Sequence, residues 1–412
     1  MKIVSYNHTG KVSGAERLLL NVLTRLDGVE FERIMVCPAD GPLAGLAAEA
    51  GMPVNTVPNL EGRFTWRPGA LLRYGKSFLE VIKDFREKII ELNPDLIHAN
   101  SIRAGLVATG ATLGLKMKVV WHLHDLLPRH PLSSAIRIVA ALSKRSRMIA
   151  VSQAVRKNFG GQLSPFLNNR ITVILNAIDL KSFSAVGNDR EEIRKGLSLE
   201  NDDLAIGIVG QLTPRKGQME LLEAFEKLLR KVPRAVLVIA GAAIFDHDCE
   251  YEELLCATAQ RLGISHRVRM LGARKDVPEI MRALDLLVIN SRREPFGLVA
   301  CEAMAVGTPV LATACDGLPE IIEHRRNGWL VPFGDQQPLV EALAFLAERP
   351  EVRRKLAGVA REDVAQRFAL ERYMNELRAF YREHARPADR TVPVATTAAS
   401  ADACAPIHAQ VR

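Results

Sequence analysis

Short runs of apolar residues alternate with longer amphipathic stretches through the first 180 residues of the chain. The runs contain few polar positions, which predicts strands that are covered on both faces of a parallel sheet. The stretches between them predict the covering helices. The expected strands are Lys2–Tyr6, Arg33–Cys37, Val54–Val57, Asp95–His98, Lys118–His122, Arg147–Val151 and Thr172–Leu175. The expected helices include Gly14–Leu26, Gly69–Leu92 and Ser133–Ser143.

The same alternation begins again after a polar stretch, residues 181–203, which we interpret as a linker. The expected strands are Leu204–Val209, Ala235–Ala240, Val268–Leu271, Leu286–Ile289 and Pro309–Ala312. The expected helices are Gln218–Lys231, Tyr251–Leu262, Val277–Ala283 and Leu298–Ala305. The fold class is therefore α/β, with two Rossmann-like, doubly wound parallel-sheet domains at 1–180 and 204–368. Because such domains bind ligands at the carboxyl ends of their strands, we expect the site in the cleft between them.

The C-terminal part has a different pattern. Two long helices are expected at Val352–Phe368 and Leu370–His384, and we expect residues 369–385 to cross back to the first domain. Residues 386–412 are rich in Ala, Thr and Pro and poor in large apolar side chains. This composition predicts a disordered tail.

The composition is that of a globular protein. Of the 412 residues, 48% are hydrophobic and 25% are charged. The longest nearly unbroken apolar run, Ala235 to Phe245, is shorter than the roughly 18 residues that span a bilayer. The start of the chain, MKIVSYN, is typical of a first strand rather than of a secretory signal. The six cysteines form no CxxC pair, which argues against a zinc ribbon or a disulfide scaffold and favours a cytoplasmic protein.

Positive charge is concentrated in the first half of the sequence. The net charge is +8, and residues 1–180 carry 23 Lys/Arg against 14 Asp/Glu, whereas residues 181–412 carry 32 against 33. This asymmetry suggests an anionic surface or substrate for the first domain, such as the inner face of a membrane. Nucleic acid is not favoured, because no helix-turn-helix, zinc-finger or RNP-type pattern is found. The basic and aromatic residues concerned are Arg63, Phe64, Trp66, Arg67, Arg73, Lys76, Lys83, Arg86 and Lys88, with Arg129, Arg137, Lys144, Arg145 and Arg147 as a second group.

A pair of adjacent cations follows the first strand of the second domain. The strand ends at Gly210, and a loop with Arg215, Lys216 and Gly217 leads into the next helix. Two cations at the carboxyl end of a strand, just before a helix N-terminus, can hold a diphosphate. A solvated Arg-Lys pair in a turn is an equally good interpretation of this segment alone.

The segment NSRREPFGLVACEAMAVGTPV places two carboxylates beside a helix start. Glu294 lies in the loop, and Glu302 follows eight positions later, a spacing of just over two helical turns. The free amides of the helix start, at Phe296, Gly297 and Leu298, would point at an anion. Glu294 can accept hydrogen bonds from sugar hydroxyls and Glu302 from a ribose. Alternatively, Glu294 is a helix-dipole partner and Glu302 a surface residue.

These motifs together resemble retaining glycosyltransferase family 4, whose members have the GT-B fold and use nucleotide-sugar donors. The resemblance rests on E-P-F-G-x-x-x-x-E-A-M-A-x-G-T-P-V, with G-x-x-x-x-x-K-G about 80 residues upstream. The first domain matches more loosely. TGKVSGAERLLLNVL resembles the Gly-Gly-x-Glu loop of the family, with Ser13 in place of the first glycine. VVWHLHD, AVSQAV and ILNAIDLKSF resemble its later segments.

The resemblance implies a role for each matching residue. Arg215 and Lys216 would bind the donor diphosphate near Gly210. Glu294 would contact the donor sugar and Glu302 the ribose. Backbone amides of Phe296, Gly297 and Leu298 would contact phosphate and sugar. Gly14 would let the diphosphate approach the first domain, Arg274 and Lys275 would lie near the base, and His124 would lie near the reacting carbon.

His124 shares a strand face with His122. The next residue, Asp125, either orients His124 or caps the following helix. A hydrolase triad is not supported, because no GxSxG elbow is present. His8, His122 and His124 lack zinc-type spacing, so we expect no essential metal and no cofactor.

The expected reaction is transfer of a sugar from a UDP- or GDP-sugar to an acceptor hydroxyl. The resemblance implies retention at the anomeric carbon. Because no carboxylate is clearly placed as a nucleophile, a same-face mechanism is favoured over double displacement. The expected acceptor is a glycan or a lipid-linked molecule of polysaccharide, lipopolysaccharide or glycolipid biosynthesis. Other GT-B enzymes, namely a nucleotide-sugar epimerase or a phosphorylase, and an inactive nucleotide-sugar-binding protein remain as alternatives.

Overall fold

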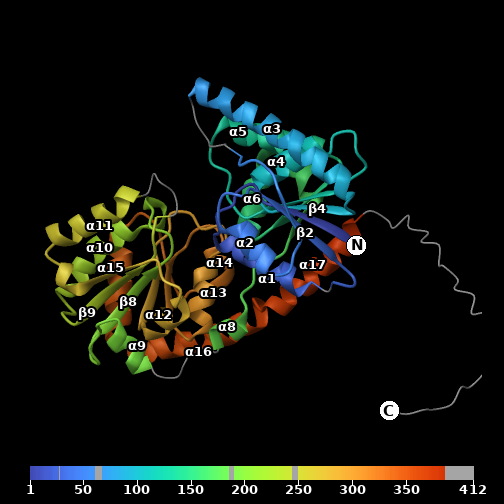
Figure 1. Cartoon of the computed structure of the whole chain (residues 1–412). Helices are drawn as coiled ribbons and strands as arrows, with labels where there is room; N and C mark the ends of the chain where they lie inside the picture. Colours follow the sequence, from blue (N-terminus) through green and yellow to red (C-terminus); the bar gives the residue numbers. More distant parts are fainter. Residues whose placement is uncertain (27, 61–66, 185–189, 244–248, 386–412) are drawn as a thin grey trace, which may run out of the picture.

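The computed structural model describes residues 1–26, 28–60, 67–184, 190–243 and 249–385. The expected tail at 386–412 lies outside these residues, as do Arg63, Phe64 and Trp66 of the basic segment. Within the described residues, two α/β domains stand side by side (Figure 1). The two predicted parallel-sheet domains are thus confirmed.

The first domain contains a seven-stranded sheet in the order β3-β2-β1-β4-β5-β6-β7, and every pair of neighbouring strands is parallel. Its strands are β1 Lys2–Tyr6, β2 Glu32–Cys37, β3 Val54–Thr56, β4 Leu96–Ala99, β5 Val119–Leu123, β6 Ser146–Ala150 and β7 Ile171–Val173. Its helices include α1 Gly14–Arg25, α2 Pro42–Glu49, α3 Pro68–Leu92, α4 Ile102–Ala111, α5 Pro131–Leu142, α6 Gln153–Gly160 and α7 Ser164–Leu167. The middle strands are buried throughout, as their apolar sequences predict.

The second domain contains a six-stranded parallel sheet in the order β10-β9-β8-β11-β12-β13. Its strands are β8 Leu204–Val209, β9 Ala235–Ala240, β10 Val268–Gly272, β11 Leu286–Ile289, β12 Val310–Thr313 and β13 Trp329–Val331. Its helices include α10 Gln218–Leu229, α11 Cys249–Arg261, α12 Val277–Ala283, α13 Leu298–Ala305, α14 Leu318–Ile321 and α15 Gln336–Glu348. Strand β13 is not among the sequence-based expectations, because three residues within a polar stretch give no periodic signal.

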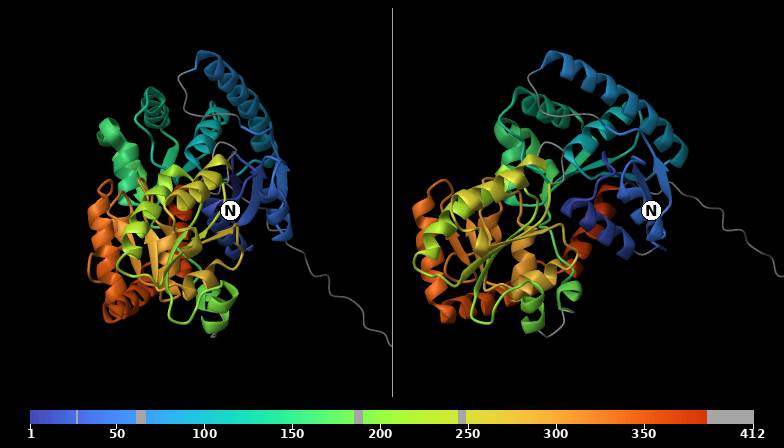
Figure 2. Two further views of the ribbon diagram at one scale, coloured as in Figure 1. Left: turned by 90° about the vertical axis from the view of Figure 1, so that its left-hand side faces the viewer. Right: turned by 60° about the vertical axis from the view of Figure 1, so that its left-hand side comes forward.

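The order of strands reverses between β1 and β4 in one sheet and between β8 and β11 in the other. Such reversals open a crevice at the carboxyl ends of the strands, because the flanking connections run to opposite faces of the sheet. In both views of Figure 2 the first domain, blue to teal, lies above and to the right of the second and packs against it. The loops that follow β1, β4, β8 and β11 border the cleft between them.

Within the predicted linker, the described residues 181–184 and 190–203 contain helical segments. They include α8 Leu180–Ser184 in part and α9 Arg190–Gly196, and α9 packs against α12. Arg194 of α9 is 2% exposed and donates hydrogen bonds to the carbonyls of Ala283, Glu200 and Asp203. It also forms an ion pair with Asp285 at 3.3 Å. Arg194 thus attaches this part of the chain to the second domain, whereas neighbours such as Glu192 and Lys195 are exposed.

Two C-terminal helices, α16 Pro350–Arg367 and α17 Leu370–His384, follow the second sheet. Helix α17 lies against the first domain (Figure 1). One face of α17, which includes Tyr373, Leu377 and Tyr381, is buried in an apolar cluster with Leu19 and Leu23 of α1. No helix of the described ranges is long and apolar enough to cross a membrane.

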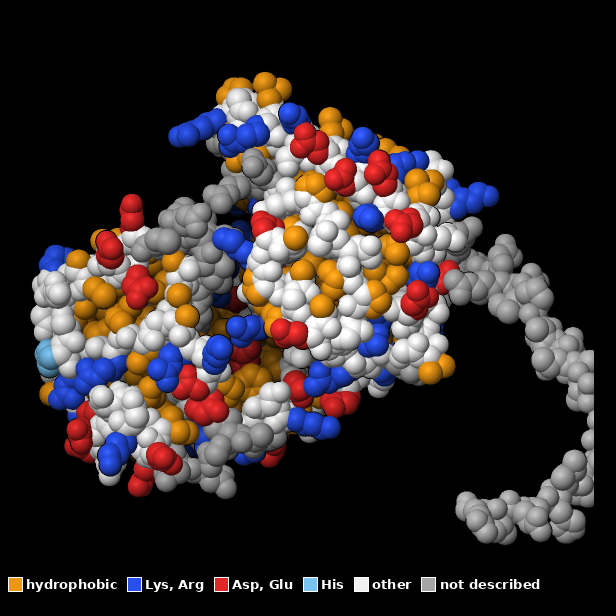
Figure 3. Space-filling model, in the orientation of Figure 1, with side chains coloured by type: hydrophobic (Ala, Val, Ile, Leu, Met, Phe, Trp, Pro, Cys, Tyr) orange, Lys and Arg blue, Asp and Glu red, His pale blue; other side chains and the backbone are white. Residues whose placement is uncertain are grey.

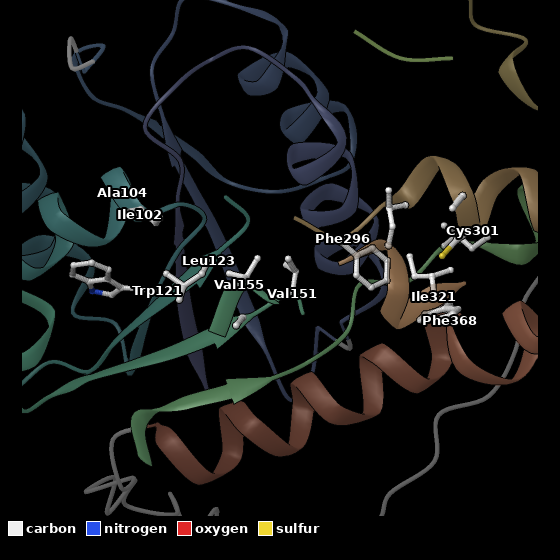
Figure 4. Close-up of a cluster of buried hydrophobic side chains, with 14 of the residues drawn as sticks. Ile102, Ala104, Trp121, Leu123, Val151, Val155, Phe296, Cys301, Ile321 and Phe368 are labelled. Atoms are coloured by element: carbon white, nitrogen blue, oxygen red, sulfur yellow. The ribbon is translucent and has the colours of Figure 1, made fainter. Parts of the chain in front are cut away.

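A continuous apolar core joins the two domains. Figure 4 shows it running from Trp121 and Leu123 of the first sheet to Phe296 and Phe368 of the second domain. The rings of Phe296 and Phe368 meet edge to face, with centroids 5.7 Å apart. The first domain is therefore held against the loop and helix that begin at Phe296, which fixes the geometry of the cleft.

Candidate active site

The cleft between the domains has a volume of about 2690 Å³. Residues of both domains line it, including Gly14, His124, Gly210, Glu294 and Glu302. Most of the residues selected from the sequence are thus brought together here from distant positions in the chain. Arg215, Lys216, Arg274, Phe296, Gly297 and Leu298 also border this cleft.

The cation loop of the second domain is held against the loop that follows β11. Gly217 has a φ of 71°, and a Cβ atom there would come within 2.1 Å of the Asn290 carbonyl oxygen. The Asn290 side chain donates a hydrogen bond to the Gly217 carbonyl at 3.0 Å. Only glycine permits this approach, so Gly217 determines where Arg215 and Lys216 lie.

Lys216 and Glu294 form an ion pair, with Nζ and Oε2 2.6 Å apart. Both side chains are largely buried, and the Ser291 hydroxyl donates a further hydrogen bond to Glu294 Oε2 at 3.1 Å. Arg215 is more exposed, and it donates a hydrogen bond to the Arg293 carbonyl at 3.0 Å. The site therefore combines two cations and a carboxylate at the carboxyl ends of β8 and β11.

Helix α13 begins beside this pair. Its N-cap is Gly297, whose φ of 112° lies in the region that favours glycine. The Phe296 side chain is 2% exposed and belongs to the interdomain core, although the residue also borders the cleft. A Cβ atom on Gly14 of the first domain would lie 3.4 Å from Leu298 Cδ1. The first loop of the chain thus approaches the first residue of α13 across the cleft.

Glu302 lies on the cleft side of α13. Burial raises the pKa of its carboxyl to about 7, although the positive charges of Arg17 and Lys216 act in the opposite direction. Arg17 belongs to α1 of the first domain and lines the same cleft. Sequence analysis missed Arg17, because its closeness to Glu302 depends on how the two domains are placed.

Arg274 and Lys275, predicted as a pair near the nucleotide base, differ in their positions. Arg274 lines the cleft and binds Asp276 through two nitrogens, at 2.8 and 2.6 Å. Lys275 is exposed and is not one of the residues that border the cleft. Successive residues of a loop need not point the same way, so the two cations differ in whether they line the cleft, and their role near the base stays a prediction.

His124 borders the cleft from the first domain, and its ring lies 3.9 Å from that of His122, measured between centroids. Its Nε2 donates a hydrogen bond to Asn100 Oδ1 at 3.0 Å. The Asn100 amide in turn donates to Asn7 Oδ1 at 3.2 Å, and the Asn7 amide donates to the Thr9 carbonyl at 2.7 Å. This series of hydrogen bonds fixes a tautomer of His124 with the proton on Nε2.

Burial lowers the pKa of His124 to about 3, and His98 adds to this decrease. His124 is therefore neutral near pH 7, and its Nδ1 carries a lone pair. A second series of contacts connects the neighbouring His122 to the C-terminal helix. His122 Nδ1 lies 3.2 Å from His98 Nε2, and His98 Nδ1 lies 2.7 Å from the Tyr381 hydroxyl. Tyr381 comes from α17, so the C-terminal helix supports the strand that carries His124.

Asp125 has neither of the two roles considered for it from the sequence. Asn100 orients His124, and the N-cap of the next helix, α5, is His130. Asp125 instead lines the cleft, where burial raises the pKa of its carboxyl while Arg215 and Arg103 oppose the rise. Within the described part of the chain, no group of three or more His, Cys, Asp or Glu residues is placed to hold a metal ion.

Each half of the chain matches a glycosyltransferase family model. Residues 12–182 match the model described as Glycosyltransferase Family 4, and residues 189–363 match Glycosyl transferases group 1. The chain belongs to these glycosyltransferases. The two matched ranges contain every site residue described above except Asn7, Thr9 and Tyr381, and the gap between them lies within the predicted linker, residues 181–203.

Relatives of known name agree with this assignment. The chain is 36% identical to a D-inositol 3-phosphate glycosyltransferase of Saccharomonospora viridis over 212 residues, which are 50% of this chain and 48% of that protein. It therefore spans about half the length of that relative. It is 29% identical to the lipopolysaccharide core biosynthesis mannosyltransferase LpsB of Rhizobium meliloti, over 64% of this chain and 78% of that one.

A solved structure matches the glycosyltransferase over most of its length. It is that of Alr3699/HepE of Anabaena in complex with UDP-glucose. The TM-score is 0.79 at 28% identity, and the match covers 93% of this chain and 100% of the other. The likeness therefore extends over both domains of a protein that was crystallised with UDP-glucose.

Proposed function

We propose that this glycosyltransferase transfers a sugar from a nucleotide-sugar, with UDP-sugars as the first candidates, to an acceptor hydroxyl with retention of anomeric configuration. The observation that carries the proposal is the buried pair of Lys216 and Glu294 beside Arg215. A cation and a carboxylate in contact provide partners for a phosphate and for the adjacent sugar hydroxyls. The Anabaena structures with UDP and with UDP-glucose support a uridine donor.

The departing diphosphate accumulates negative charge as the glycosidic bond breaks. Arg215, Lys216 and the amides at the start of α13 offset this charge. Hydrogen-bond donors that are already in position before the reaction stabilise developing charge most effectively. His124, neutral with a lone pair on Nδ1, accepts a hydrogen bond from a sugar hydroxyl. This scheme needs no metal ion, since Arg215 and Lys216 supply the positive charge that a metal ion would supply.

We further propose that the acceptor is a glycan or lipid-linked molecule of cell-surface polysaccharide, lipopolysaccharide or glycolipid biosynthesis. The name of the Rhizobium relative supports this class of acceptor. The excess of positive charge in residues 1–180 supports a location on the cytoplasmic side of an anionic membrane.

The proposal is tested by incubating the full chain with UDP-, GDP- and ADP-glucose, and with the corresponding galactose and mannose donors, and by measuring the nucleoside diphosphate released. Slow hydrolysis of one donor class is the expected result, and it should be absent in Lys216→Ala. Lys275→Ala is the matched control, because Lys275 is exposed beside the cleft without lining it. Failure to bind or hydrolyse any donor would contradict the proposal.

A further inference from the structure

The cleft does not end at the donor site. It continues into a groove on the first domain whose floor is α4 and whose walls are α3 and α5. These three helices project together at one end of the molecule (Figures 1 and 2). The lining is mainly apolar and includes Leu71, Phe78, Ile82, Leu106, Val139 and Leu142, with Thr109 and Thr112 among its polar members.

Apolar side chains on these helices are exposed to an unusual degree. Leu142 is 75% exposed and Leu113 is 70% exposed, although both border the groove. Leu72 and Leu79 of α3 and Ile138 of α5 lie nearby and are at least half exposed. Single exposed leucines are ordinary, whereas a group of them around one groove indicates a ligand or partner.

Positive charge borders the groove at both ends. Lys144 and Arg145, just after the end of α5, border its outer part. Arg103 lies at the inner end, where its guanidinium approaches His8 Nε2 at 3.4 Å and lowers the pKa of Asp125 in the cleft. Figure 3 shows hydrophobic and basic side chains together at the end of the molecule that carries α3. An apolar groove with cationic ends is complementary to an amphiphile with an anionic head.

The length of the groove limits its occupant. The lining residues of α3 run from Leu71 to Ile82, which is about 16 Å along a helix. This is longer than one sugar unit and offers few hydrogen-bonding partners for a polar chain. A hydrocarbon chain fits it, because a chain gains free energy from each methylene that it buries.

We propose that this groove binds the hydrocarbon chain of a phosphate-bearing lipid acceptor, with the phosphate at Arg103 and the accepting hydroxyl between His124 and the Lys216–Glu294 pair. The inference rests on the proposed function and identifies the acceptor class for the same cleft. The outer cations, Lys144 and Arg145, would face the anionic membrane from which the lipid is taken.

The experiment measures binding of alkyl phosphates to the full chain by calorimetry, below their micelle concentrations and in the presence of UDP. Affinity should rise about three- to fourfold for each methylene added from butyl to dodecyl phosphate, while inorganic phosphate should bind much more weakly than the dodecyl ester. Affinity that does not depend on chain length would overturn the proposal, and binding of inorganic phosphate alone would indicate a phosphate site instead.

Ala135→Trp tests the location, because Ala135 is exposed and lines the groove, so a larger side chain fills it without disturbing the core. This variant should bind dodecyl phosphate about tenfold or more weakly, because at least two methylenes of the chain would no longer be buried. Its affinity for UDP should not change. Ser134→Trp, on the exposed neighbour that does not line the groove, is the control. An equal effect of both variants, or none, would overturn the assignment.

Two further measurements separate the groove from the proposed function and from the membrane surface. If the protein hydrolyses a donor but its affinity for alkyl phosphates does not depend on their chain length, the proposed function stands and the groove is rejected. If it hydrolyses no donor, the proposed function is rejected first. Vesicles of phosphatidylglycerol should still bind Ala135→Trp at low salt, because surface charge is unchanged. Loss of vesicle binding in Ala135→Trp but not in Ser134→Trp would instead make the groove a membrane-insertion surface and overturn its role as an acceptor site.

Discussion

Lys216 and Glu294 are 78 residues apart in sequence, yet Nζ and Oε2 lie 2.6 Å apart at the base of the cleft. The resemblance to family 4 assigns one of them to the diphosphate and the other to the sugar, as if they acted independently. Their contact means that each holds the other in place before a donor arrives. It also means that a substitution of either residue changes the environment of both proposed contacts.

Lys216→Ala should therefore weaken binding of UDP and also destabilise the protein. Loss of a charge-assisted contact to phosphate costs about 1.5–3 kcal/mol, which corresponds to a roughly ten- to hundredfold weaker affinity. Removal of one partner of a buried ion pair costs on the order of 3 kcal/mol in stability. Calorimetry with UDP and denaturant unfolding measure the two effects, with Lys275→Ala as control. Unchanged affinity for UDP would show that Lys216 does not contact the diphosphate.

The pKa of Glu302 predicts a dependence of stability on pH. Its folded-state value of about 7 lies above the ordinary value of 4.5, so the folded protein binds this proton more tightly than the unfolded chain. The free energy of unfolding should then be highest, with respect to this group, below about pH 4.5, and it should fall as the pH rises through 7.

Glu302→Gln should remove this fall. At pH 8 the variant should be more stable than the native protein by on the order of 1–3 kcal/mol, since each pKa unit corresponds to about 1.4 kcal/mol. At pH 4.5 the difference should vanish. Urea unfolding at both values checks this, and equal stabilities at pH 8 would show that the carboxyl is not desolvated. The variant should at the same time bind UDP more weakly, as expected if Glu302 binds the ribose.

Asn100 should control the protonation of His124. With the amide in place, burial keeps the pKa of His124 at about 3, so its titration does not affect activity between pH 6 and 9. In Asn100→Asp a carboxylate would replace the amide oxygen 3.0 Å from Nε2, and an opposite charge at this distance raises the pKa of a histidine by one or more units.

The pH–rate profile of Asn100→Asp should therefore acquire a new ionisation that the native enzyme lacks, and Asn100→Ala should lose rate without gaining that ionisation. Imidazole resonances followed by NMR report the pKa directly. A profile of Asn100→Asp parallel to that of the native protein would show that Asn100 does not set the protonation state of His124.

The sequence predicts the sheets well because buried parallel strands are apolar nearly throughout, as β8 and β9 are. It also locates the loops that carry Lys216 and Glu294, since each directly follows such a strand. It does not reveal Asn100 or Arg17. Their roles depend on the adjacency of β1, β4 and β5 and on the approach of α1 to α13, which are contacts between residues far apart in the chain. The one available signal for Asn100 was its position, as the polar residue that directly follows the buried strand β4.

Polar composition was the least reliable guide. The polar composition of residues 181–203 predicts a linker but does not reveal that Arg194 within it is buried and binds three backbone carbonyls. A guanidinium can satisfy several carbonyls in a fixed fork, so an arginine can be a core residue when its partners are on the backbone. Similarly, Phe296 is part of the cleft motif, but its ring packs in the interdomain core.

Metal dependence separates two ways of stabilising the departing diphosphate. Arg215, Lys216 and the start of α13 already supply positive charge, so activity with the preferred donor should persist in excess EDTA. The release of UDP in the presence and absence of EDTA measures this, with added magnesium as the control. Complete loss of activity that magnesium restores would contradict the metal-independent mechanism.

Glu320 of α14 should control how far the cleft opens. Its two carboxylate oxygens accept hydrogen bonds from the backbone N–H groups of Gln153 and Ala154, both at 2.8 Å, at the start of α6 in the first domain. The Ser152 hydroxyl donates to the Pro295 carbonyl at 2.6 Å beside this contact. A carboxylate at a helix N-terminus interacts favourably with the unpaired amides and the helix dipole. In Glu320→Ala the two amides would hydrogen-bond to water, and the interdomain contact would keep the Ser152–Pro295 hydrogen bond and its apolar part. We expect a larger radius of gyration by small-angle X-ray scattering without UDP, and a lower kcat with little change in affinity for UDP, because Glu320 does not border the cleft.

Glu323→Ala, at the exposed end of the same segment, is the matched control. A native radius of gyration and a native kcat in Glu320→Ala would show that the Glu320 carboxylate does not hold the domains in place.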